Sequence, residues 1–196
     1  MNRSTRVLAA ATTLAATVVS GLAIAAPAQA RTTTCAIQPY GAIGDFWRSL
    51  GGERSPLGCP TSEEKGVPNQ NGRKQRFAGG QVAWSPDQGS NMIVAAYESN
   101  GKAVFRWGPT NPFNYDYWRI HWKASPNIGL VGFPSHDVTT RTSSRTAGKV
   151  IGYPPAGVTN SSGYSATYTF WVEGCDDKLT GDTCRQGWTI PVSVNA

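Results

Sequence analysis

Four cysteines, two near each end of the chain, constrain the fold of this sequence more than any other feature. Cys35 and Cys59 lie in the first third, and Cys175 and Cys184 lie close to the end. Four cysteines allow three pairings. Since the members of each pair are close in sequence and the two pairs fall in separate regions, we expect Cys35 to bond Cys59 and Cys175 to bond Cys184. Zinc binding is the competing explanation, but the chain has no C-x-x-C and its two histidines lie far from both pairs. We therefore expect neither a metal nor a cofactor.

The first 30 residues are typical of a secretory signal peptide. Arg3 and Arg6 give a positive start, residues 7–26 are an apolar run, and Ala28-Gln29-Ala30 supplies a cleavage site. An uncleaved membrane anchor is the alternative. We predict that residues 1–30 are removed and that the protein is secreted, extracellular or cell-wall associated, where disulfides persist. No later stretch is long and apolar enough to cross a membrane, so we expect no membrane contact after cleavage.

The charge of the chain is positive but modest. The sequence has 18 Lys and Arg against 12 Asp and Glu, for a formal net charge of +6. This excess favours solubility and loose association with anionic wall polymers. It does not form the dense basic stripe of a nucleic-acid-binding protein, so we expect no nucleic acid as a partner.

Residues 31–90 predict a small module with one helix and one hairpin. Ile43, Phe46, Trp47 and Leu50 have the i, i+3, i+4, i+7 spacing of a helix with one buried face, and Gly51-Gly52 ends it. After a polar loop, two short strands flank Gly79-Gly80, because adjacent glycines permit the backbone angles of a tight hairpin.

The order of residues in this module resembles the LGFP repeat of secreted and wall-associated actinobacterial proteins. The resemblance covers residues 41–90 and rests on Trp47, Leu50-Gly51-Gly52, Leu57-Gly58-x-Pro60, Phe77-x-Gly79-Gly80 and Trp84-Ser85-Pro86. It implies an extracellular module that holds proteins at the cell wall, and no catalytic mechanism. This chain departs from the pattern in two ways, because Cys59 replaces the signature aromatic residue and only one copy is convincing.

Residues 91–196 predict an antiparallel β-sandwich. Residues 91–99 and 102–107 alternate like strands and are joined by Asn100-Gly101, a strong hairpin signal. Further strand-like runs follow at residues 115–123, 164–174 and 188–194, with less distinct ones between. Their order resembles a fibronectin type III or immunoglobulin-like sandwich. We therefore expect a mainly β protein in which a small α+β module packs on a sandwich.

An exposed aromatic and cationic face is the first candidate binding site. If Trp118 and Trp122 point inward, then Tyr117 and Arg119 point outward, and Trp171 points outward on the other strand of the pair. Such a face suits stacking on a sugar ring, although packing against the first module explains the same residues. Trp84 of the LGFP-like stretch is a further aromatic candidate.

The loop between the last two cysteines is the second candidate. A disulfide would preorganise a segment that contains Asp176, Asp177, Lys178 and Asp182, and preorganised loops at the end of a sandwich are common contact surfaces. The alternative is that the disulfide only stabilises a long exposed turn. The aspartates do not have EF-hand spacing, which argues against calcium.

The sequence favours a non-catalytic protein. It has neither a G-x-S-x-G nor an H-E-x-x-H motif. We predict a secreted module that associates with cell-wall or extracellular polysaccharide. The alternatives are a protein that binds or inhibits an extracellular protein through the 175–184 loop, and a hydrolase whose carboxylates meet only in the fold.

Overall fold

Short alternating runs form strands in the computed structural model, which describes residues 34–126, 136–140, 144–152, 166–184 and 186–196. The predicted signal peptide lies outside these residues. The helices are α1 (Gly41–Ser49) and two single 3₁₀ turns, η1 (Gly52–Arg54) and η2 (Pro86–Gln88). The strands are β1 (Lys65–Gly66), β2 (Arg73–Phe77), β3 (Gly80–Trp84), β4 (Ile93–Ser99), β5 (Lys102–Gly108), β6 (Tyr117–Pro126), β7 (His136–Thr140), β8 (Gly148–Gly152), β9 (Ala166–Cys175) and β10 (Val192–Asn195).

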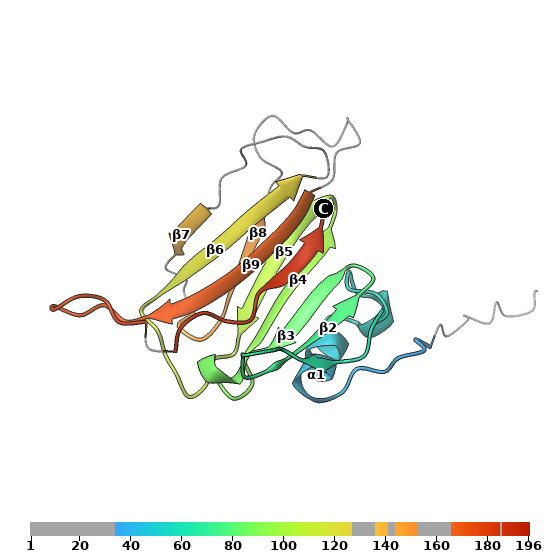
Figure 1. Ribbon diagram of the computed structural model, residues 1–196, viewed down its shortest axis with the longest axis horizontal. Coiled ribbons are helices and arrows are strands. Elements are labelled where there is room, and N and C mark those ends of the chain that lie inside the picture. Colours follow the sequence, from blue (N-terminus) through green and yellow to red (C-terminus); the bar gives the residue numbers. More distant parts are fainter. Residues whose placement is uncertain (1–33, 127–135, 141–143, 153–165, 185) are drawn as a thin grey trace, which may run out of the picture. The chain divides into compact units, whose positions relative to one another are not determined.

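The strands form two sheets in which every pair is antiparallel. The larger sheet has the order β1-β2-β3-β4-β5-β8 and the smaller has the order β10-β9-β6-β7. The smaller sheet lies across β3, β4 and β5 of the larger one (Figure 1). The prediction of a mainly β fold with antiparallel sheets and one short helix is confirmed.

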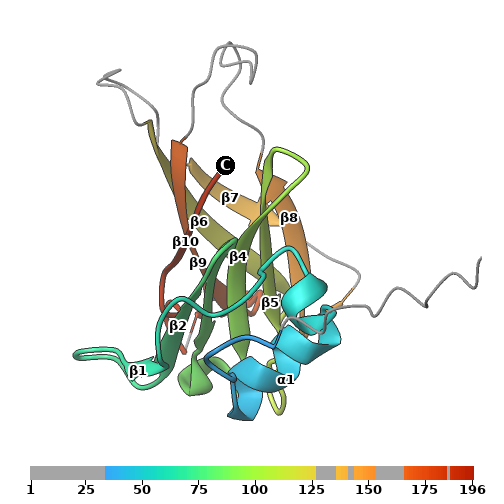
Figure 2. The same ribbon diagram turned by 90° about the vertical axis from the view of Figure 1, so that its right-hand side faces the viewer.

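Two apolar cores lie on opposite faces of the six-stranded sheet. One fills the space between the sheets and contains Phe105 stacked on Phe170, with ring centroids 4.5 Å apart. The other lies between the sheet and α1 and contains Ile43, Trp47 and Leu57. Figure 2 shows α1 on one side of β4 and β5, with β6 and β9 on the other. Since β4 lies between both cores, its residues 93–97 are apolar and buried on both faces, where the sequence prediction was an alternating strand.

The helix and the glycine stop predicted for the first module are present in the structure. α1 ends before Gly51 and Gly52, which both have positive φ. The indole Nε1 of Trp47 donates to the carbonyl oxygen of Gly58 at 2.8 Å, and the disulfide between Cys35 and Cys59 ties the segment before α1 to the same turn. The predicted pairing of Cys35 with Cys59, and that of Cys175 with Cys184, is confirmed.

The predicted boundary at residue 90 falls between two strands that pair directly. β3 and β4 are neighbours in the six-stranded sheet, and residues 33–196 form one unit of contacts. The LGFP-like hairpin therefore extends the same sheet as the β4–β5 hairpin. In the part of the chain that the structure describes, the helices are all too short or too polar to span a bilayer.

Candidate functional site

The outward face of the four-stranded sheet gathers charged and aromatic side chains. The register of β6 and β9 places Arg119 opposite Glu173 and His121 opposite Trp171. Residues opposite each other in a sheet point to the same face, so these four side chains lie together. Trp188, which precedes β10, adds its ring to them. We call this cluster of five residues the outer-face platform.

The contacts within the platform are close. Arg119 Nη1 lies 2.8 Å from Glu173 Oε1, and the side chains are 45% and 6% exposed, respectively. The guanidinium thus offsets the charge of a buried carboxylate while part of it stays open to solvent. The rings of His121 and Trp171 are 4.3 Å apart, and Trp188 lies 6.3 Å from His121 with its ring 5.7 Å from the Arg119 guanidinium. The Trp188 residue is 37% exposed.

Two buried polar residues from the LGFP-like stretch hold the segment that carries Trp188. Gln88 Nε2 donates to the carbonyl oxygens of Gln186 and Trp188, at 2.8 and 3.2 Å. Ser85 Oγ donates to Gln88 Oε1 and accepts a hydrogen bond from the backbone of Ile190. On its other side, Thr189 pairs with Val172 of β9 through backbone and hydroxyl groups. The position of Trp188 is therefore fixed from both sheets.

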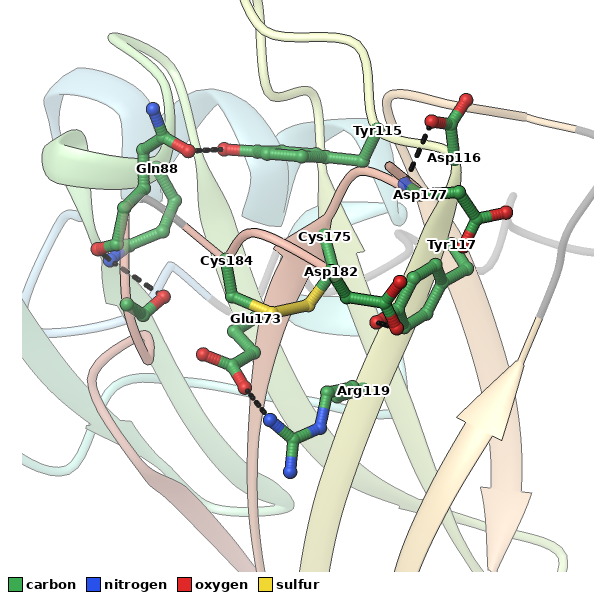
Figure 3. Close-up of a disulfide and its surroundings, with 12 residues drawn as sticks. Gln88, Tyr115, Asp116, Tyr117, Arg119, Glu173, Cys175, Asp177, Asp182 and Cys184 are labelled. Atoms are coloured by element: carbon green, nitrogen blue, oxygen red, sulfur yellow. Dashed lines mark hydrogen bonds and ion pairs between the residues drawn. A yellow bond between two sulfur atoms is a disulfide. The ribbon is translucent and has the colours of Figure 1, made fainter. Parts of the chain in front are cut away.

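Tyr117 lies on the outward face but is not exposed, which corrects the sequence prediction. It is 5% exposed because the 175–184 loop covers it, and its hydroxyl donates to Asp182 Oδ2 at 2.6 Å (Figure 3). This hydrogen bond, with burial as a second cause, raises the pKa of Tyr117 to about 12. Alternation along a strand correctly assigns the face but does not show what a distant loop covers.

The 175–184 loop is braced at several points. Asp176 and Thr183 exchange two backbone hydrogen bonds beside the disulfide, and the backbone of Asp177 donates to Asp116 Oδ2 at 3.1 Å (Figure 3). At the tip, Gly181 N donates to Lys178 O, which closes a tight turn. Lys178 and Asp182 are exposed, and the side chain of Leu179 is fully exposed.

Trp84 does not join the other predicted site residues. It lies on β3 of the other sheet, packs against the core beneath α1, and donates from Nε1 to Ser90 O at 2.8 Å. The platform is on a different sheet, so the structure does not bring Trp84 and Trp171 together.

Sequence reasoning missed two members of the platform. Trp188 opens the predicted strand at residues 188–194, but β10 begins only at Val192. Glu173 is not among the predicted site residues, although its register opposite Arg119 follows once β6 and β9 are paired. The alternation that turns Arg119 outward turns His121 outward as well. The one local signal for Trp188 in the sequence is the preceding glycine, Gly187, because glycine favours turns. In the structure Gly187 has a positive φ and turns the chain just before Trp188.

Among the residues that the structure describes, two groups have the proximity of metal ligands, but their chemistry does not suit a metal. They are Cys35, Glu53 and Cys59, and Glu173, Cys175 and Cys184. All four sulfurs are in disulfides, whereas a metal binds the thiolate. We assign no metal to either group.

Comparison with known proteins identifies one stretch of the chain. Residues 57–108 match the family model of the LGFP repeat, a non-catalytic module of cell-wall or secreted proteins. The match starts later than the predicted 41–90 and continues through β4 and β5, which we had assigned to the sandwich. It covers about a quarter of the chain. No curated protein and no solved structure matches the chain, so the resemblance to fibronectin type III stays a prediction.

Proposed function

We propose that this chain is a non-catalytic module that associates with cell-wall or extracellular polysaccharide through the outer-face platform. The LGFP match supports the setting, since these repeats occur in cell-wall or secreted proteins. The two disulfides fit an oxidising, extracellular location.

The observation that carries the proposal is the partly exposed ring of Trp188 beside His121, Trp171 and the Arg119–Glu173 pair. Aromatic rings offer a large, rigid apolar surface to the C–H face of a sugar ring. The guanidinium of Arg119 is partly exposed and has N–H donors in a fixed geometry, so it suits sugar hydroxyls, while the buried Glu173 holds it in place. Because Gln88 and Thr189 fix the backbone beside Trp188, little ordering is needed on binding.

Cosedimentation with isolated cell walls tests this proposal. We expect the purified protein to sediment with walls or insoluble polysaccharide at high salt, where its attraction to anionic wall polymers is screened, and Trp188→Ala to weaken this binding at least tenfold. Tyr40→Ala is the matched control. Tyr40 is an aromatic residue that is 55% exposed, and it directly precedes α1, which packs on the six-stranded sheet and not on the sheet that carries the platform. Equal binding by the wild type and Trp188→Ala would exclude the platform as the contact surface.

A second candidate function is suggested by Leu179. A fully exposed leucine at the tip of a braced loop has the form of an apolar anchor for a pocket on another protein. Chemical crosslinking in culture supernatant, followed by identification of the crosslinked proteins, tests this candidate. We expect Leu179→Asp to lose crosslinks that Thr180→Ala, a change at an exposed neighbour in the same loop, retains. Replacement of residues 178–181 by a Gly-Ser turn with no change in crosslinks would rule it out.

A further inference from the structure

The six-stranded sheet projects past the edge of the four-stranded sheet. β10 is the edge strand of the smaller sheet and packs across β3 and β4, so β1 and β2 extend beyond it. Lys74 Nζ donates to Pro191 O, and the backbone of Ser193 donates to Gln81 Oε1, so β2 and β3 side chains line the edge of β10. The result is a ledge with β2 as its floor and β10 as its wall.

Three cations share this ledge. Lys65 is directly opposite Lys74 in the β1–β2 pair, and Arg76 follows Lys74 by two residues, so all three point to one face. The register with β3 sets Lys74 opposite Ala83, which points into the core between the sheets. The cations therefore continue the inner face of the sheet at the point where the second sheet no longer covers it.

Two adjoining hollows run along the ledge and share Arg76. One, of about 380 Å³, is lined by Lys65, Lys74 and Arg76, with Glu63 at its end. The other, of about 420 Å³, continues from Arg76 to hydrogen-bonding side chains of β9, β10 and β3, namely Thr167, Ser193, Asn195 and Gln81, with Glu98 at its end. We call the two hollows together the basic groove.

The three cations of the groove outnumber its two carboxylates, Glu63 and Glu98. Among the described residues, Lys65, Lys74 and Arg76 form no ion pair. Lys74 donates to a neutral carbonyl, and burial, followed by the charge of Arg76, lowers its pKa. On the opposite face of the same strand, by contrast, Arg73 is paired with Glu64. Like charges directly opposite each other destabilise a sheet, and a bound anion relieves this repulsion.

We infer that the basic groove binds a polysaccharide that carries carboxylate or phosphodiester groups, with anionic groups at Lys65, Lys74 and Arg76 and sugar hydroxyls at Thr167, Ser193 and Asn195. Lys74 and Arg76 are separated by about 7 Å along the strand, so successive charged groups of one polymer chain fit them. Nucleic acid is the less suitable polyanion, because the groove has no exposed aromatic ring for base stacking and few cations for phosphate contacts. The groove shares no residue with the outer-face platform, although Thr167, Ser193 and Asn195 lie further along the same outward face of the four-stranded sheet, and its binding does not depend on the platform's function.

Binding of defined polymers tests this inference. We would measure the affinity of the full protein for polygalacturonate, poly(glycerol phosphate), neutral dextran and single-stranded DNA at low and moderate salt. We expect binding to polygalacturonate, to poly(glycerol phosphate) or to both, weaker binding at higher salt, and no binding to dextran that depends on the groove. The two charged polymers distinguish carboxylate from phosphodiester recognition.

Matched charge variants locate the site. The double variant Lys65→Ala, Arg76→Ala removes two exposed cations of the groove, and we expect at least tenfold weaker binding. Arg54→Ala, Lys149→Ala removes two exposed cations elsewhere and should stay within about twofold of the wild type. Trp188→Ala should also retain this binding. Equal losses in both double variants, no binding of either charged polymer, or tighter groove-dependent binding of DNA would each overturn the inference.

Discussion

Tyr117 shows at the residue scale how the stapled loop is held to the sheet. Its raised pKa of about 12, against about 10 in an unfolded chain, means that the unfolded state ionises first as the pH rises. The stability that the Tyr117 hydroxyl contributes is therefore fully present below about pH 10 and is lost between about pH 10 and 12. We expect Tyr117→Phe to cost about 1 kcal/mol at neutral pH through the lost hydrogen bond and to make that decline shallower. Chemical denaturation at a series of pH values measures both effects. An unchanged decline would show that Tyr117 does not contribute to it.

Gly79 has a steric role that explains the paired glycines of the hairpin. A Cβ at this position would lie 1.9 Å from the carbonyl oxygen of Pro56. We expect Gly79→Ala to displace the β2–β3 turn and to destabilise the protein by about 1 to 3 kcal/mol. Gly66→Ala is the matched control, since a Cβ there meets nothing within 4 Å. Thermal unfolding of the two variants would contradict this explanation if both lost the same stability.

Alternation along strands correctly predicted the outward direction of Arg119 and Trp171, because direction depends only on the parity of the strand. Whether a side chain is shielded from solvent depends on contacts with residues that are far away in the sequence. Tyr117 is covered by Asp182, and Trp188 is brought to His121 by hydrogen bonds to Gln88. No local pattern encodes these contacts, which is why the site could be predicted only in part.

At the scale of elements, the disulfide between Cys175 and Cys184 closes an exposed loop. The separation of the two cysteines is 9 residues, for which the chain-entropy model gives about 2.5 kcal/mol of stabilisation. We expect the double variant Cys175→Ser, Cys184→Ser to unfold about 5 to 10 °C below the wild type. Differential scanning calorimetry measures the change. An unaltered melting temperature would mean that the backbone pairs of Asp176 and Thr183 already hold the loop.

Elements with strong local signals were predicted well. The Asn100-Gly101 turn joins β4 and β5 with positive φ at both residues, and the spacing of Ile43 and Trp47 gave α1 within two residues of its bounds. β1 has only two residues, too few for a periodic pattern to locate it. The predicted run at residues 188–194 located β10 but placed its start four residues too early. Sequence alone does not reveal which strand edges pair, so the pairing of β3 with β4 across the predicted boundary was missed.

At the scale of the whole molecule, the LGFP-matched segment positions the platform through Gln88. We expect Gln88→Ala to lose the contacts to residues 186 and 188, to cost about 1 to 3 kcal/mol, and to weaken polysaccharide binding although every platform side chain is present. Gln70→Ala is the control, because Gln70 is exposed in the loop before β2. Binding by Gln88→Ala at the wild-type level would show that Trp188 needs no support from this segment.

The most direct test of the platform as the polysaccharide contact is NMR titration of the indole N–H signals. The chain has seven tryptophans, each with one such signal. On addition of soluble wall-polysaccharide fragments, we expect the signals of Trp171 and Trp188 to shift, because both rings lie in the platform. The signals of Trp47 and Trp84, which bond to carbonyl oxygens on the other side of the fold, should stay in place. Shifts at Trp47 and Trp84 with the platform signals unmoved would contradict the proposal.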